Sequence, residues 1–152
     1  MTGPETRRPQ VDNPDATRDE WLTDLYELLA QVRRWTEGSG WRTRVIEKSM
    51  KDSVLGQYKA PAMLMQRETV EVILDPVGRF APGTDGVVDL YLLPAYDDIA
   101  SLYLVDGAWK LHYAFRSTAV VARIKQAESM TLDEVSLNRV LNEIAAHAAF
   151  VS

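Results

Sequence analysis

Short connections between β-type segments are the feature that most constrains the fold of this chain. Two parallel neighbours in a sheet need a crossover of a dozen or more residues, whereas antiparallel neighbours can be joined by a tight turn. Most of the connections between residues 41 and 115 are too short for a crossover helix, so the sequence predicts antiparallel strands. The segments are residues 41–50, 61–66, 69–74, 87–93, 99–105 and 108–115.

The stretch 61–74 fits two structures. Its Gly- and Pro-bounded apolar residues are typical of strands, but its unbranched Met, Leu, Gln, Arg and Glu side chains also favour a helix. A hairpin and a helix therefore both stay open for this stretch.

The sharpest local signal is the Asp-Gly pair at 106–107, which lies between two alternating segments. Such a pair is the signature of a two-residue type I′ hairpin. The turn sets the strand register, and it places Leu104 opposite Trp109 and Ser101 opposite His112. Because side chains alternate along a strand, we expect the first pair on the core face and the second pair on the other face.

Helical patterns lie on both sides of the β region. Residues 17–20 (Thr-Arg-Asp-Glu) have the spacing of a capping box, and an apolar stripe from Trp21 to Trp35 follows them up to the glycines at 38 and 40. Residues 118–127 predict a short helix capped by Thr118. A second capping box at 131–134 predicts the start of a last helix, with Leu137, Val140, Leu141, Ile144 and Ala148 on one face.

These elements predict an α+β fold with an N-terminal helix, an antiparallel sheet of five or six strands, and two C-terminal helices. Residues 1–16 hold three of the seven prolines and predict a flexible tail, whereas residues 17–152 predict a single domain. The segment 87–93 is apolar on both faces, so we expect both faces of the sheet to be covered there. Helices would cover one face, and a partner or a second copy the other.

Composition excludes several classes of protein. The chain has 152 residues, no Cys and two His, so it holds no disulfide, thiolate zinc site or multi-histidine metal cage. Its N-terminal region lacks the apolar segment of a signal peptide, and no apolar run approaches the ~18 residues of a membrane span. We therefore expect a cytoplasmic protein with no cofactor and no membrane contact.

Charge is segregated along the chain, and residues 33–67 contain eight basic and three acidic side chains. Arg42, Arg44 and Lys48 share one strand face in this block. That face has three interpretations: a site for an acidic partner, a site for nucleic acid beside Trp35 and Trp41, or a solvated edge strand whose charges discourage pairing with other strands.

Residues 68–106 contain eight acidic side chains and one basic one, and most of the acids mark turns. Asp89 is the exception, because it lies inside an apolar strand and must find a partner or take up a proton. We interpret Asp89 as structural. The alternative is a Mg²⁺-dependent phosphodiesterase or nuclease-like enzyme centred on Asp89, with Asp97 and Asp98 as further metal ligands.

A catalytic triad of Asp89, Ser101 and His112 fails on geometry. Even in the favourable register, neighbouring strands would place Ser101 between the other two residues. Triad chemistry needs the histidine in the middle, because it takes a proton from the nucleophile and is oriented by the acid. His147, on the last helix, is predicted to interact with the helix dipole near the C-terminal turn.

The connection 75–86 is long for a compact sheet, and Arg79 and Phe80 are its only bulky side chains. Long ordered loops are often functional, so these two residues are candidates for partner binding together with Arg42, Arg44 and Lys48. The sequence favours a non-enzymatic protein-interaction module that associates with another chain or with itself, as a subunit or accessory factor of a larger assembly. The metal-dependent enzyme and a nucleic-acid-binding accessory protein remain the alternatives.

Overall fold

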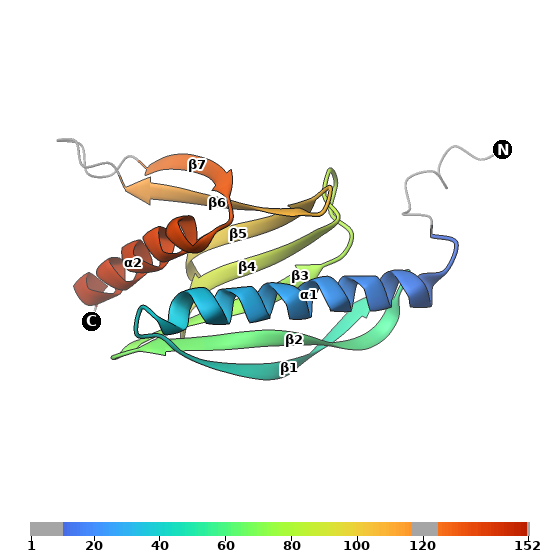
Figure 1. The fold of residues 1–152 in the computed structure, drawn as a ribbon, viewed down its shortest axis with the longest axis horizontal. Coiled ribbons are helices and arrows are strands. Elements are labelled where there is room, and N and C mark those ends of the chain that lie inside the picture. The colour runs from blue at the N-terminus through green and yellow to red at the C-terminus, as the bar shows by residue number, and fades with distance from the viewer. Residues whose placement is uncertain (1–10, 117–124, 152) are drawn as a thin grey trace.

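The computed structural model describes residues 11–116 and 125–151, which form two helices and one seven-stranded antiparallel sheet (Figure 1). Strand order follows the sequence, so each strand pairs with the next one along the chain. Among these residues, neither helix has the length and apolar character needed to cross a membrane. The elements are α1 (Pro14–Glu37), β1 (Arg42–Asp52), β2 (Gly56–Arg67), β3 (Val70–Gly78), β4 (Gly86–Leu92), β5 (Asp97–Val105), β6 (Ala108–Arg116), β7 (Lys125–Thr131) and α2 (Glu134–Val151).

The seventh strand corrects two expectations, a sheet of five or six strands and a second C-terminal helix. Ala127, assigned to a helix over 118–127 by its spacing, lies in β7 opposite Ala114 of β6. Residues 118–124 of that predicted helix lie outside the described residues. Gln, Ala, Glu and Met favour a helix locally, but pairing with residues 110–116 of β6 overrides that weak preference.

The stretch 61–74 forms the hairpin of β2 and β3, which settles the choice that the sequence left open. Met63 pairs with Leu74, and Arg67 pairs with Val70 across the turn. Glu68 lies in this two-residue turn with a φ of 57°, the left-handed geometry that such tight hairpins require.

The predicted β5–β6 hairpin is confirmed. Asp106 and Gly107 both have positive φ, 51° and 78°, as a type I′ turn demands. Leu104 pairs with Trp109, and Ser101 pairs with His112.

The first helix begins earlier than its sequence pattern predicts. The side chain of Asn13 accepts a hydrogen bond from the backbone N–H of Ala16, and Pro14 is the first helical residue. Asn is a favoured cap and proline is favoured at the first helical position, so this pair outcompetes the predicted capping box at Thr17. The expected apolar stripe is buried, and the helix ends at Glu37 before Gly38.

The second helix is also capped differently from the prediction. Asp133 and Ser136 bond reciprocally, each side chain accepting from the other residue's backbone N–H, at 2.8 and 2.9 Å. The cap is thus Asp133, two residues after Thr131. The predicted apolar face is confirmed, since Leu137, Val140, Leu141 and Ile144 are fully buried.

Both helices pack on the same face of the sheet, and the core lies between them and the strands (Figure 1). The helices thus cover one face, as expected, and within the described residues no helix covers the second face. Cover of that second face by a partner or a second copy stays a prediction. We call this second surface the open face. From the strand register it includes Arg42, Arg44, Ile46, Lys48, Leu64, Ile73, Asp75, Val87, Asp89, Tyr91, Ser101, Tyr103, Lys110 and His112.

One close approach on the core face requires glycine. A Cβ atom at Gly86 would lie 2.2 Å from Cζ3 of Trp21, far inside van der Waals contact. Trp21 is fully buried and lies near Trp109, with 6.4 Å between the ring centroids. The glycine at the start of β4 thus makes room for the indole that joins α1 to the sheet.

Candidate functional site

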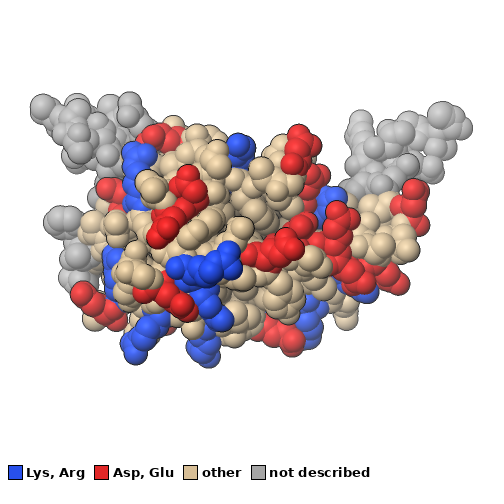
Figure 2. Space-filling view, in the orientation of Figure 1, with Lys and Arg blue, Asp and Glu red and all other residues tan. Residues whose placement is uncertain are grey.

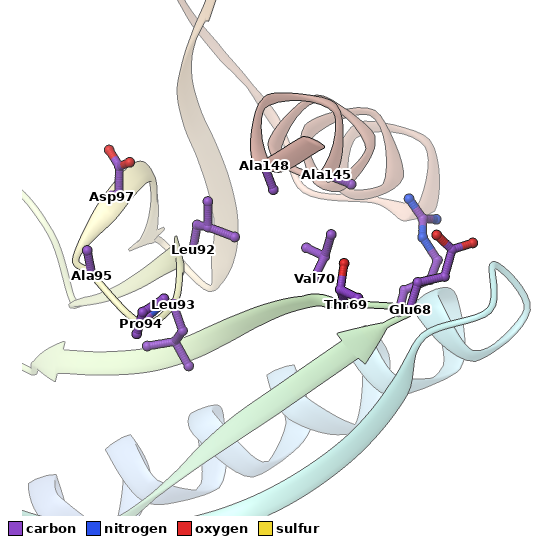
Figure 3. Close-up of a pocket in the computed structure, with 11 residues that line it drawn as sticks. Glu68, Thr69, Val70, Leu92, Leu93, Pro94, Ala95, Asp97, Ala145 and Ala148 are labelled. Atoms are coloured by element: carbon purple, nitrogen blue, oxygen red, sulfur yellow. The ribbon is translucent and has the colours of Figure 1, made fainter. Parts of the chain in front are cut away.

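A cavity of about 580 Å³ lies between α2, the β2–β3 turn and the segment that joins β4 to β5 (Figure 3). We call it the α2 pocket. Three elements that are far apart in the sequence therefore form its walls. The described residues that line it are Arg67, Glu68, Thr69, Val70, Leu92, Leu93, Pro94, Ala95, Asp97, Ala145 and Ala148.

The pocket exists because small side chains stand where the rest of the interface is filled by large ones. Ala145 and Ala148 follow the buried Leu141 and Ile144 on α2, and Ala95 lies on the opposite wall. A methyl group reaches too short a distance to meet Val70 and Leu92 across the gap. The walls are therefore mostly apolar and leave a space open beside the sheet.

Charged groups lie at the rim of the pocket. Glu68 and Asp97 stand at opposite ends of the row of lining residues in Figure 3. Arg67 is held in place, because it donates to the backbone oxygen of Ser39 and to Oδ1 of Asn142. Its guanidinium carbon also lies 4.6 Å from the ring centroid of Trp41. These contacts make Arg67 a fixed part of the wall.

A buried polar cluster joins α2 to the start of β5 next to the pocket. Nδ1 of His147 lies 2.6 Å from Oδ2 of Asp98, and the hydroxyl of Tyr113 donates to Oδ1 of the same carboxylate at 2.6 Å. Nε2 of His147 lies 3.4 Å from Oε2 of Glu143. The side chains of His147 and Asp98 are only 10% and 9% exposed. The cluster therefore fixes the helix that forms one wall of the pocket.

The segment between β4 and β5 is tied to both faces of the sheet. Asp98 turns toward α2 with a φ of 50°, a left-handed geometry that Asp tolerates better than most residues. Two residues earlier, the hydroxyl of Tyr96 donates to Oδ2 of Asp89 on the open face at 2.5 Å. Pro94 and Ala95, which line the pocket, belong to the same short segment. Contacts on the two faces thus hold this wall.

The open face contains two carboxylates side by side, because Asp75 and Asp89 are direct cross-strand partners. Asp75 accepts from Nζ of Lys48 and from the hydroxyl of Tyr91, both at 2.7 Å. Asp89 accepts from the Tyr96 hydroxyl and, at 3.2 Å, from Oγ of Ser101. Every oxygen of the two carboxylates thus has a protein donor, and hydroxyl groups hold Asp89, as its structural interpretation requires.

The two tyrosines of this network keep their protons over a wide pH range. The hydrogen bond to Asp89 raises the pKa of Tyr96 to about 12. Burial, followed by the hydrogen bond to Asp75, raises the pKa of Tyr91 to about 12. Ionising either phenol would place a negative charge beside a carboxylate. Both groups therefore act as donors.

The structure does not bring the alternative metal ligands together. Asp89 points to the open face, whereas Asp98 bonds to His147 and Tyr113 on the helix side. Oδ1 of Asp97 accepts from the backbone N–H of Asp98. Within residues 11–116 and 125–151, no three His, Cys, Asp or Glu side chains are grouped as a metal ion needs.

Asp89, Ser101 and His112 lie in the order predicted from the strand register. Ser101 pairs with Asp89 on one side and with His112 on the other, so the serine is in the middle. His147 was predicted to interact with the dipole at the end of the last helix, and that prediction missed its main contacts. The residue is buried and bonded to Asp98. His147 and Asp98 are 49 residues apart, so no local sequence pattern predicts their contact.

The loop candidates Arg79 and Phe80 face back toward their own domain. Phe80 packs against the core as a partly buried residue, and the guanidinium carbon of Arg79 lies 5.2 Å from its ring centroid. On β1, Lys48 is bonded to Asp75 and to the backbone oxygen of Pro76. Arg42 and Arg44 are exposed, and neither forms an ion pair within the described residues.

Acidic side chains gather over the N-terminal half of α1 on the helix-covered side of the molecule (Figure 2). Asp24 belongs to this group. Partial burial, followed by the negative charges of Glu20 and Glu27, raises its pKa. The arginines of β1 and this acidic helix surface therefore give the molecule two regions of opposite charge.

Comparison of the chain with protein-family models, curated proteins and solved structures finds no match. A proposal for the function therefore rests on the geometry of the α2 pocket and of the open face.

Proposed function

We propose that the protein is a non-enzymatic interaction module, a subunit or accessory factor of a larger cytosolic assembly, that receives an apolar segment of a partner protein in the α2 pocket. The observation that supports this function is the cavity of about 580 Å³ with mostly apolar walls. Binding pockets commonly measure roughly 300–1,000 Å³ and combine apolar walls with a few polar groups.

The size and lining of the pocket suit one or two large apolar side chains. Interfaces between proteins obtain most of their binding energy from a few anchors buried in such pockets. Val70 and Leu92 would contact an anchor from the sheet, and Ala145 and Ala148 would leave it room from the helix. The fixed Arg67 would stay in place at the rim.

The polar groups beside the pocket and on the open face support binding in preference to catalysis. Asp98 and His147 bond to each other, and each oxygen of the Asp75 and Asp89 carboxylates accepts from one protein donor. A Mg²⁺ ion at Asp89 would compete with the hydroxyl groups of Tyr96 and Ser101 for the same carboxylate oxygens. A metal-dependent enzyme would therefore have to rearrange these hydrogen bonds before a reaction could occur at Asp89.

The first test is an NMR titration with an uncharged peptide, acetyl-Gln-Leu-Phe-Leu-Gln-amide. We expect it to shift the amide signals of the pocket residues in the wild type and in Ala146→Trp, because Ala146 is exposed on the same helix and does not line the pocket. In Ala145→Trp, the added indole fills the cavity and the shifts should disappear. Equal shifts in the two variants, or shifts confined to other surfaces, would show that the pocket is not the binding site.

The second test asks whether the natural occupant is a protein. A photo-crosslinking amino acid at Ala95 should capture one partner protein in the native host, and Ala145→Trp in the same chain should abolish that capture. Ala146→Trp is again the control. Capture that persists when the pocket is filled, or a small molecule that co-purifies in the pocket without any captured protein, would refute the proposed function.

A further inference from the structure

Among the described residues, the β1 strand is one edge of the sheet and pairs only with β2. It pairs with β2 over eleven consecutive residues, Arg42–Asp52, with no break in register. Within residues 11–116 and 125–151, no strand pairs with the backbone N–H and C=O groups on its other side. Such an edge is a template for an added strand unless charges, proline or a bulge protect it.

The usual protection is weak in the middle of this edge. The segment 42–52 contains no proline and no bulge. Lys48, which would otherwise project a charge from the centre of the strand, reaches across the sheet to Asp75 and Pro76. Val45 is 42% exposed, and Ile46 is half-buried. The centre of the edge is therefore accessible, and it combines the apolar Val45 and Ile46 with one exposed charge, Glu47.

Two free cations lie beside this accessible stretch. Arg42 and Arg44 are exposed, have no ion-pair partner among the described residues, and share the open face because they are two positions apart. A strand paired with β1 would place its own alternate side chains next to these arginines. Acidic residues at those alternate positions would complement both charges.

We propose that an extended segment of a partner protein, with acidic side chains at alternate positions, adds to β1 as an eighth strand. Backbone hydrogen bonds along the edge supply affinity in this mode, and the alternating side chains supply specificity. None of the described residues that line the α2 pocket lies in β1, so this surface is separate from the one in the proposed function.

The observations favour a peptide over nucleic acid or a second copy. Trp41 is buried under Arg67 and Trp35 packs against the core, so neither indole is free to stack on bases. The chain has a net charge of −5, which opposes a phosphate backbone. Antiparallel pairing of β1 with its own copy over 42–52 would place Glu47 opposite Glu47 and Arg44 opposite Met50, so Arg44 would gain no acidic partner.

The test compares two peptides with the same apolar residues, acetyl-Thr-Glu-Val-Glu-Val-Thr-amide and its counterpart with Gln in place of Glu. NMR titration of the wild type should shift the β1 amides, and the acidic peptide should bind about two- to thirtyfold more tightly, the range for two surface ion pairs. In the Arg42→Glu/Arg44→Glu variant this preference should vanish. Arg34→Glu, a change of an exposed arginine on α1, should leave it intact.

Each opposite result overturns the proposal. Equal affinity for the two peptides, or an acidic preference that survives in Arg42→Glu/Arg44→Glu, would show that the arginines do not select the strand. Light scattering that finds a dimer in the wild type and a monomer in this variant would assign the edge to a second copy. Tight binding of a polythymidine oligonucleotide that the variant loses would assign it to nucleic acid.

Discussion

Replacement of Asp98 by Asn tests the buried cluster that holds α2 beside the pocket. The carboxylate accepts from Tyr113 and faces Nδ1 of His147, each at 2.6 Å, in a site where both side chains of the Asp98–His147 pair are about nine-tenths buried. Asn has the same shape and tolerates the φ of 50° at this position, so the substitution removes the charge with little change in backbone energy.

The expected loss follows from the bonds to the charge. Hydrogen bonds to charged groups contribute about 1.5–3 kcal/mol. We therefore expect Asp98→Asn to lower the free energy of unfolding by at least about 1.5 kcal/mol. Asp98→Ala should cost more, because alanine adds about 1–2 kcal/mol of left-handed backbone strain.

Urea unfolding followed by tryptophan fluorescence measures this loss, with Asp97→Asn as the control. Asp97 is the exposed neighbour, and Asn at this position can still accept the bond from the backbone N–H of residue 98. Hydrogen exchange should also quicken in α2 before it quickens in α1. An Asp98→Asn protein within about 0.5 kcal/mol of the wild type would refute a stabilising role for the cluster, since surface substitutions fall in that range.

Three further predictions concern the core and the open face. Gly86→Ala should destabilise the fold by about 1–3 kcal/mol, measured by urea unfolding, and much less in a Trp21→Ala background, because the new Cβ would clash with the indole. The folded-state pKa of Tyr96 is raised to about 12, so its stabilising effect is complete below pH 10 and lost as the pH rises toward 12; melts from pH 9 to 12 should show a smaller loss for Tyr96→Phe. Millimolar Mg²⁺ should leave the melting temperature of both the wild type and Asp89→Asn unchanged, whereas a shift confined to the wild type would support the metal-dependent alternative.

Local patterns in the sequence determined the parts of the fold whose contacts are close along the chain. The Asp-Gly pair at 106–107 fixed the β5–β6 register, and with it the placement of Ser101 beside His112. The apolar stripes of the two helices likewise predicted which residues are buried. Turn geometry and helical periodicity act over a few residues, so these features can be predicted from one sequence.

The seventh strand, β7, forms because of its pairing with β6. Residues 125–131 combine side chains that favour a helix, and they become a strand because residues 110–116 of β6 pair with them. The same holds for the β2–β3 hairpin, whose residues fit either structure until Met63 pairs with Leu74. Propensities of a few tenths of a kcal/mol per residue yield to such pairing.

The candidate site was decided almost entirely by the tertiary structure. Asp98 and His147 are 49 residues apart, and the walls of the α2 pocket come from three separate parts of the chain. The sequence by itself determined that Asp89 needs a partner, but only the strand register and the turn before β5 supply Ser101 and Tyr96. A cavity arises where packed elements fail to fill the space between them, and that space has no counterpart in the order of the residues.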